Sequence, residues 1–309
     1  MDFASSIRLI ALAAIWGASF IFTRVGVPVF GPAVLILLRV GLAALFLSLV
    51  AWRMRRALAI ARNWRHYFII GAFNCSVPFM LYAYSAQYLN ASLLAIVNAT
   101  APISGAIVAA IWLRTPLTRT AMLGLALGFA GVAMIVGGDM LNSEPGDGSW
   151  LLPLLAALTA PICYGIASSY TKLYASDIDP YNNAHGSMWG AALLVLPVCL
   201  FLPAPRTPAP FDWSVITALA VLCTGVAYVL YFRLIRDVGP ARALTVTFLI
   251  PVFGVLWGML FLGESVSWMM LGGGLVVLLG TALSNGAIRR PQAICKQVTR
   301  RFLMLLALK

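Results

Sequence analysis

Long apolar runs follow one another along the whole chain, separated by short polar or glycine- and proline-bearing connections. Each run has about 18 or more residues, the length that a helix needs to cross the hydrocarbon core of a bilayer. Ten runs are predicted as membrane-spanning helices: 7–24, 32–52, 66–87, 91–112, 119–137, 150–174, 181–202, 213–236, 240–262 and 267–287. The pattern therefore predicts an all-α, multi-pass membrane protein.

The composition excludes an ordinary soluble domain. Of the 309 residues, 62% are hydrophobic and only 10% are charged, whereas soluble domains carry roughly 25% charged residues. The five cysteines show no Cys-x-x-Cys spacing, and those inside predicted spans are Cys75, Cys163, Cys199 and Cys223. Cysteines in such positions act as small apolar fillers, so we expect no disulfide, no metal site and no cofactor.

The net charge of +12 comes chiefly from two basic segments, the connection around 53–65 and the tail 288–309. If both segments are cytoplasmic, every Lys and Arg except Arg24, Arg39 and Arg206 lies on that side, which is the bias that orients membrane proteins. We therefore expect both termini to lie in the cytoplasm. Membrane lipids are an expected contact of the basic segments, and nucleic acid is not an expected partner.

The chain contains an internal repeat. The segment NATAPISGAIVAAIWL (98–113) corresponds to TFLIPVFGVLWGMLFL (247–262), with Pro102 matching Pro251 at an offset of 149 positions. Further pairs at an offset of 148 or 149 are Gly17 and Gly165, Tyr82 and Tyr231, Gly105 and Gly254, Gly124 and Gly273, and Gly131 and Gly280. A long series at a nearly constant offset indicates duplication.

The repeat predicts the domain organisation. We expect a first repeat at 1–137, a periplasmic linker at 138–149, a second repeat at 150–287 and a basic cytoplasmic tail at 288–309. Each half holds five predicted spans, and an odd number turns the second half upside down relative to the first. Two inverted five-helix repeats around a central cavity are a transporter architecture that works by alternating access.

Two stretches carry a resemblance to a known family. The run AAIWGASFIFTRV (13–25) and the sequence LIPVFGVLWGMLFLGESVSWMMLGGGLVVLLG (249–280) resemble the EamA family of drug/metabolite transporters. Within that family the chain is most similar to YddG-type bacterial exporters of aromatic amino acids, a resemblance that implies a location in the bacterial inner membrane. One residue departs from the family pattern, because the first-half equivalent of Glu264 is Thr115.

Helical spacing places several polar and aromatic residues on shared faces of the predicted spans. The candidate substrate-binding residues are Trp16, Asn74, Pro78, Tyr82, Asn98, Pro102, Tyr164, Tyr228, Tyr231, Thr247 and Pro251. An amide in a membrane helix needs a protein partner or a wet cavity, and an aromatic-rich pocket with few amides suits a flat, mostly apolar solute.

Each of these residues also has a structural interpretation. The asparagines could join helices by hydrogen bonds, the tyrosines could anchor the protein at the membrane interface, and Trp16 could pack in the core. Within membrane helices, Pro102 and Pro251 predict equivalent bends that either shape and hinge the cavity or only assist packing.

The ionisable residues refine this picture. All nine acids fall in connections, tails or span ends, whereas proton relays use carboxylates inside the membrane. Arg39 lies within a span and could attract a substrate carboxylate, bind helix carbonyls or extend to the interface. His185 could carry a proton, although a structural role is expected, and His66 is expected to be solvated at a cytoplasmic edge. Arg24 and Lys172 are expected to cap the ends of their helices.

We expect a transporter that exports aromatic amino acids and related small metabolites without ion coupling. The alternative within the same superfamily is a proton-coupled exporter of other metabolites or drugs. A channel would need a continuous polar pore, whereas this chain offers aromatic residues and isolated amides, so a channel is disfavoured. An enzyme is disfavoured because the catalytic motifs of hydrolases and nucleotide-binding proteins are missing from the sequence. The one Asp-x-Asp, ending at Asp179, fits a helix N-cap ahead of Pro180 better than a metal motif.

Overall fold

The computed structural model describes residues 2–114, 116–142 and 150–284, and every regular element within them is a helix. In chain order these are α1 (Phe3–Arg53), α2 (Ile60–Ile70), the π-helical segment η1 (Gly71–Ser76), α3 (Val77–Ser85), α4 (Ala91–Asn98), α5 (Ala101–Trp112), α6 (Arg119–Asn142), α7 (Leu151–Tyr174), α8 (Pro180–Val195), α9 (Val198–Phe201), α10 (Pro210–Thr217), the π-helical segment η3 (Ala218–Val226), α11 (Ala227–Val238), α12 (Pro240–Ala243), α13 (Val246–Leu262) and α14 (Trp268–Ser284). Thr115, most of the predicted linker and the predicted basic tail lie outside the described residues.

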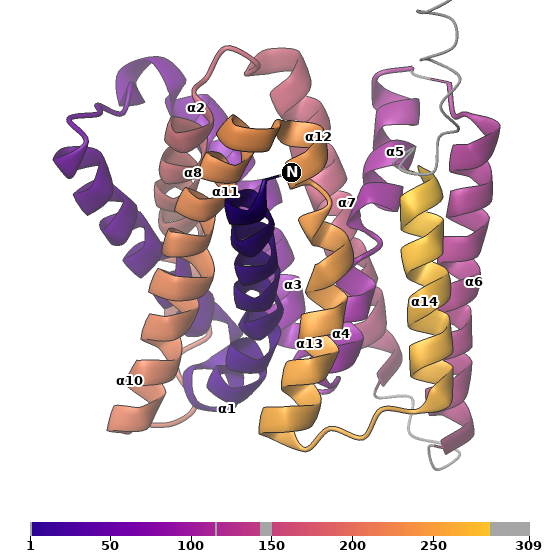
Figure 1. Cartoon of the computed structure of the whole chain (residues 1–309). Helices are drawn as coiled ribbons and strands as arrows, with labels where there is room; N and C mark the ends of the chain where they lie inside the picture. Colours follow the sequence, from indigo (N-terminus) through magenta and orange to yellow (C-terminus); the bar gives the residue numbers. More distant parts are fainter. Residues whose placement is uncertain (1, 115, 143–149, 285–309) are drawn as a thin grey trace, which may run out of the picture.

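The helices run side by side in one bundle (Figure 1). Within the described part of the chain, the stretches that are long and apolar enough to cross a membrane are 3–53, 62–85, 91–112, 151–174, 180–201 and 210–238. Three shorter apolar helices accompany them: Arg119–Ile135, Val246–Leu262 and Trp268–Ser284. The described part of the chain is therefore all helical and has the apolar helices of a multi-pass membrane protein, as the apolar runs predicted.

The first two predicted spans belong to one helical element, α1, which changes direction at Gly31. Gly31 has φ 68° and ψ 164°, a backbone conformation open almost only to glycine. Pro28 and Pro32 flank it, and a Cβ on Gly31 would lie 3.1 Å from Cδ of Pro205. Because the side chains of Leu12, Leu35, Ile36 and Leu47 are fully buried, α1 forms much of the core.

Both π-helical segments occupy matching places in the repeat, since η1 corresponds to residues 220–225 at an offset of 149. In η1 the Ser76 hydroxyl donates to the carbonyl of Gly71 at 3.1 Å. In η3 the Thr224 hydroxyl donates to the carbonyl of Leu219 at 3.0 Å. Such wide turns are rare inside helices and frequent at functional sites.

The matched prolines occupy different positions in their helices. The expected bend at Pro102 is a break at 99–100, after which α5 begins with Pro102 in its first turn. Proline fits that position because its missing N–H has no helical partner there. Pro251, in contrast, lies within the continuous helix α13. The second-half break comes earlier, between α12 and α13, so the two prolines differ in their distance from the nearest break, and the equivalent bends stay a prediction.

Glycines bring α6 and α14 close together, and these two helices lie side by side in Figure 1. A Cβ on Gly124 would collide with the carbonyl of Gly280, and one on Gly131 would collide with that of Gly273. The two contacts run in opposite directions along the chain, so the helices are antiparallel. The repeat pairs Gly124 with Gly273 and Gly131 with Gly280, and it therefore exchanges one contact for the other.

A second glycine pair shows the same exchange. A Cβ on Gly17 in α1 would lie 2.9 Å from the amide nitrogen of Gly254 in α13. A Cβ on Gly165 in α7 would lie 3.1 Å from Cα of Gly105 in α5. Gly17 corresponds to Gly165 and Gly254 to Gly105, so the contact between Gly17 and Gly254 and the contact between Gly165 and Gly105 are equivalent in the repeat. Small residues at such crossings allow membrane helices to approach closely.

Candidate functional site

An aromatic group joins the first half of the chain to the second. The ring centroid of Trp16 in α1 lies 5.3 Å from that of Tyr231 and 6.3 Å from that of Tyr228, and both tyrosines belong to α11. Tyr228 stacks on Phe232 with ring centroids 5.8 Å apart. These distances are typical of favourable aromatic pairs. The structure therefore brings together three of the predicted site residues.

The amide of Asn74 reaches the same group from η1. Its Nδ2 donates to the hydroxyl of Tyr228 at 3.4 Å. A long bond of this kind leaves much of the capacity of the amide unused, because an asparagine has two donors and a carbonyl acceptor. Asn74 is half-buried, so its amide is not sealed by its neighbours.

A second polar pair lies within the first half. The hydroxyl of Tyr82 in α3 donates to Oδ1 of Asn98, the last residue of α4, at 3.2 Å. The Tyr82 ring packs edge-on against Phe20 at 5.7 Å. Tyr82 is only 5% exposed, so it does not anchor the protein at a membrane interface. Asn98 ends α4 at the break before α5, where the backbone is not continuously helical.

Arg39 lies close to Tyr228 of the first group and to Tyr164. Its guanidinium carbon lies 3.8 Å from the centroid of the Phe79 ring, and its Nε donates to Oγ1 of Thr224 at 3.2 Å. Tyr164 and Tyr228 are close enough to interact electrostatically with it. The predicted alternatives of binding helix carbonyls or extending to the interface do not describe Arg39, which is 8% exposed and bonds a side-chain hydroxyl.

We name this set the aromatic–amide cluster. It consists of Trp16, Arg39, Asn74, Phe79, Tyr82, Asn98, Tyr164, Thr224, Tyr228 and Tyr231. Its members come from both halves of the chain and from both π-helical segments. The cluster combines flat aromatic faces with a few amides and hydroxyls and one cation, which are the kinds of group that line pockets for small aromatic or polar solutes.

The other predicted site residues lie apart from these contacts. Pro78 and Pro251 are buried within their helices, and Pro102 is half-buried in the first turn of α5. Thr247 turns its hydroxyl to the carbonyl of Leu244 at 2.8 Å, which is a local bond within its own segment. A role of these four residues in binding therefore stays a prediction.

Sequence reasoning left three members out of the candidate list: Arg39, Phe79 and Thr224. A signal existed for Arg39, because a cation within an apolar membrane span is energetically costly and is normally paired or functional. Thr224 had a weaker signal, as a neighbour of Tyr228 on the same span. Nothing in the sequence distinguishes Phe79 from the chain's other phenylalanines, since its role depends on the approach of Arg39 from another segment.

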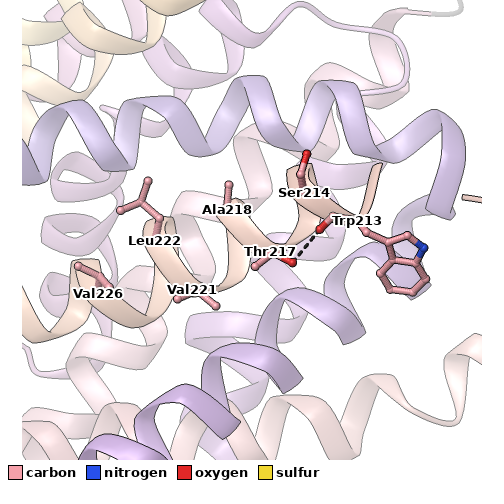
Figure 2. A pocket seen from close by; sticks show the side chains of 7 residues that line it. All are labelled: Trp213, Ser214, Thr217, Ala218, Val221, Leu222 and Val226. Carbon is pink, nitrogen blue, oxygen red and sulfur yellow. Dashed lines mark hydrogen bonds between the residues drawn. The ribbon is translucent and has the colours of Figure 1, made fainter. Parts of the chain in front are cut away.

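A pocket of about 600 Å³ lies away from the cluster, along one face of α10 and η3 (Figure 2). It is lined by Trp213, Ser214, Thr217, Ala218, Val221, Leu222 and Val226. The Thr217 hydroxyl donates to its own helix, to the carbonyl of Trp213 at 2.7 Å, as Figure 2 shows. Trp213 and Leu222 are exposed and apolar, so this face suits lipid rather than a polar solute.

The two histidines are both buried, and the expectation for His66 is wrong. His66 is 7% exposed, its Nε2 lies 2.8 Å from Oδ1 of Asn183, and its ring stacks on Tyr170 at 5.5 Å. Residues far along the chain therefore cover a position that seemed solvated. His185 shares a 2.8 Å hydrogen bond with the hydroxyl of Ser48, while its Nδ1 has no hydrogen-bond partner among the described residues.

The predicted caps are partly confirmed. The Asp179 carboxylate accepts from the amide of Asn182 at 3.3 Å with Pro180 opening α8, as expected. Lys172 lies in the last turn of α7. Arg24 lies inside α1 instead of at a helix end, and its guanidinium donates to the carbonyl of Ala86, which follows α3. Arg24 thus caps a neighbouring helix and not its own.

Comparison with known proteins places these observations in context. The chain is 25% identical over 286 residues to the uncharacterized transporter YoaV of Bacillus subtilis, covering 91% of this chain and 97% of YoaV. It is 23% identical over 279 residues to a probable terminal-alkyne amino-acid exporter of Streptantibioticus cattleyicolor, covering 90% of this chain and 92% of that protein. A crystal structure with a TM-score of 0.66 and 14% identity covers 94% of this chain and all of its own, which shows a shared fold.

The profile of one family matches the chain twice. The EamA-like transporter family matches residues 5–137 and again residues 151–286. Together these matches cover most of the 309 residues. The chain therefore belongs to the EamA-like transporter family.

Proposed function

We propose that this membrane transporter carries aromatic amino acids and related small metabolites by alternating access, and that the aromatic–amide cluster binds them. The observation that carries the proposal is the meeting of Trp16 with Tyr228 and Tyr231 across the two halves. An aromatic side chain of the solute finds flat partners there, and the amides of Asn74 and Asn98 match its polar groups. A relative named as a probable amino-acid exporter supports this class of cargo.

The proposed architecture is ten spans arranged as two inverted repeats, with both termini in the cytoplasm of a bacterium. The exchange of glycine contacts supports it, because a two-fold relation makes residue i contact j and the equivalent of j contact the equivalent of i. The antiparallel crossing of α6 and α14 agrees with inverted halves. In such transporters the solute lies between the repeats, and the cluster draws its members from both of them.

Transport without ion coupling is part of the proposal. The acids whose side chains the structure describes are engaged at helix ends and connections, as the carboxylates of Asp179 and Asp237 illustrate. A proton-coupled carrier normally places a carboxylate beside the solute. The second candidate function is proton-coupled export of other metabolites, and the unpaired Nδ1 of His185 is the feature that favours it.

Uptake by purified protein in liposomes tests the proposal. We expect saturable counterflow of phenylalanine, tyrosine or tryptophan that does not change when a pH gradient is applied. Replacing an aromatic partner by alanine, as in Tyr231→Ala, should weaken apparent affinity about three- to tenfold. Tyr88→Ala serves as the matched control, because Tyr88 is an exposed tyrosine outside the cluster. Strong dependence on the gradient would favour the second candidate, and equal effects of both variants would place the site elsewhere.

A further inference from the structure

Arg39 is a cation enclosed within the helical bundle. It lies in α1 and is 8% exposed, and its neighbours along the helix, such as Ile36 and Ala43, are fully buried. The ring of Phe79 covers one face of the guanidinium. An arginine in a membrane segment normally faces the bundle interior and is paired with another group.

The acids whose side chains the structure describes do not supply a counter-ion for Arg39, because each has a different partner. These partners are Ser5 for Asp2, Arg62 for Asp177, Arg56 for Asp179, the amide of Ala209 for Asp212, Arg8 for Asp237 and the amides of Ala91 and Ser92 for Glu264. The groups that interact electrostatically with Arg39 are Tyr164, Cys223, Tyr228 and Cys75. These phenols and thiols are uncharged at neutral pH.

The terminal nitrogens of Arg39 remain available. Only Nε has a hydrogen bond among the described residues, the one to Thr224. The buried polar atoms of the described residues that lack a partner are His66 Nδ1, His185 Nδ1 and Ser284 Oγ. Nη1 and Nη2 of Arg39 make no hydrogen bond to a described residue, and yet they are not among the fully buried atoms that lack a partner. These two nitrogens therefore keep some solvent-accessible surface. The contacts with Phe79 and Thr224 hold the plane of the guanidinium, and its two terminal nitrogens make no hydrogen bond to a described residue.

We propose that Arg39 binds the carboxylate of the transported solute. An enclosed cation without an anion is unfavourable, and a carboxylate that approaches Nη1 and Nη2 supplies the missing charge through two parallel hydrogen bonds. The aromatic members of the cluster then hold the side chain of the same solute. The inference rests on the proposed function and narrows the class of solute. Solutes with an anionic group are accepted, whereas cationic amines without one are repelled by the positive charge of Arg39. Thr224 is a positioning residue that acts through Arg39.

A binding assay that does not depend on transport tests this assignment. Thermal stabilisation of the full-length protein in detergent is measured with phenylalanine, 3-phenylpropionate, phenylalaninamide and phenethylamine. We expect the two carboxylates to bind more tightly than the two amines, by on the order of tenfold to a thousandfold. Arg39→Gln should abolish this preference, and Arg39→Lys should keep part of it because lysine retains the charge without the bidentate edge. Thr224→Val should reduce the preference without abolishing it.

Arg24→Gln is the matched control, since Arg24 is a half-buried arginine of the same helix that bonds a backbone carbonyl outside the cluster. It should leave the ratio between phenylalanine and phenylalaninamide unchanged. If Arg39→Gln does not fold, the wild-type comparison and Arg39→Lys decide the question. Equal binding of carboxylate and amide by the wild type, or an unchanged ratio in Arg39→Gln, overturns the assignment.

Failure of the aromatic cargo is a separate result. If none of the aromatic compounds binds, the proposed function is wrong, and leucine with leucinamide becomes the test pair. A preference for leucine that is lost in Arg39→Gln supports the carboxylate site for another class of cargo. The lack of a preference for leucine over leucinamide overturns both proposals.

Discussion

The carboxylate of Glu264 lies over the amino end of α4, where its Oε2 accepts from the amide of Ser92 at 2.9 Å and from the Ser92 hydroxyl at 2.6 Å. Its Oε1 accepts from the amide of Ala91 at 2.6 Å. Asn90 accepts from the next free amide, that of Leu93, at 2.8 Å. A negative charge at this end of a helix is favourable because the unpaired N–H groups carry partial positive charge. The connection after α13 is thereby fastened to the first half of the chain.

Replacing Glu264 by glutamine should lower the thermal unfolding midpoint in detergent. Glutamine lacks the charge and turns an NH₂ group toward backbone donors. We therefore expect the free energy of unfolding to fall by about 1–3 kcal/mol. Ser92→Ala removes only the hydroxyl bond and should have a smaller effect. A glutamine variant as stable as the wild type would show that the capping bonds contribute little.

The glycine crossing between α6 and α14 gives a second prediction with an internal control. Gly273→Ala would press a methyl group against the carbonyl of Gly131, and overpacking of this kind destabilises by about 1–3 kcal/mol. A Cβ on the adjacent Gly272 would meet only the end of the Met134 side chain, at 3.8 Å. Gly272→Ala should therefore be neutral or stabilising by up to about 1 kcal/mol. Equal midpoints for the two variants would contradict the close crossing.

A third prediction concerns the bend in α1. Gly31→Ala forces a side chain into a backbone region that favours glycine, which costs about 1–3 kcal/mol. Gly41 lies in the same element with helical backbone and open space around it. Gly41→Ala is therefore expected to be neutral or stabilising. Thermal unfolding of both variants measures the difference, and a tolerated Gly31→Ala would mean that the bend can relax.

The proposed orientation in the membrane can be tested by labelling single cysteines in intact cells. Ala57 and Thr207 are both exposed and lie in different connections. In a background without the native cysteines, a membrane-impermeant maleimide should label Thr207→Cys and should reach Ala57→Cys only after the cells are opened. The reverse pattern would turn the proposed topology over.

The helices were largely predictable because membrane helices need long apolar runs, and such runs can be recognised directly in the amino-acid sequence. The predicted spans 7–24 and 32–52 placed a division in this region, but the sequence did not show that the helix continues through 25–30 up to Gly31. The burial of His66 was also missed. Its partner Asn183 is 117 positions away, and contacts at such separations leave no trace in local spacing.

Part of the candidate site followed from spacing alone. Trp16, Tyr228 and Tyr231 were placed on candidate faces by helical periodicity, and the structure brings them together. Arg39 and Thr224 could not be joined in this way, because their contact spans 185 positions. Its geometry also depends on η3, where the helical period itself changes, and a constant period cannot anticipate that change.

The two π-helical segments have a consequence for how the gene can vary in length. A wide turn holds more residues than an α-helical turn, so η1 and η3 each store surplus chain within a membrane helix. A single-residue deletion there can be absorbed by tightening the turn, with the neighbouring helix left in register. The same deletion in α7 or α13 would rotate every following residue to a new face. Length changes among homologous sequences should therefore collect at 71–76 and 218–226.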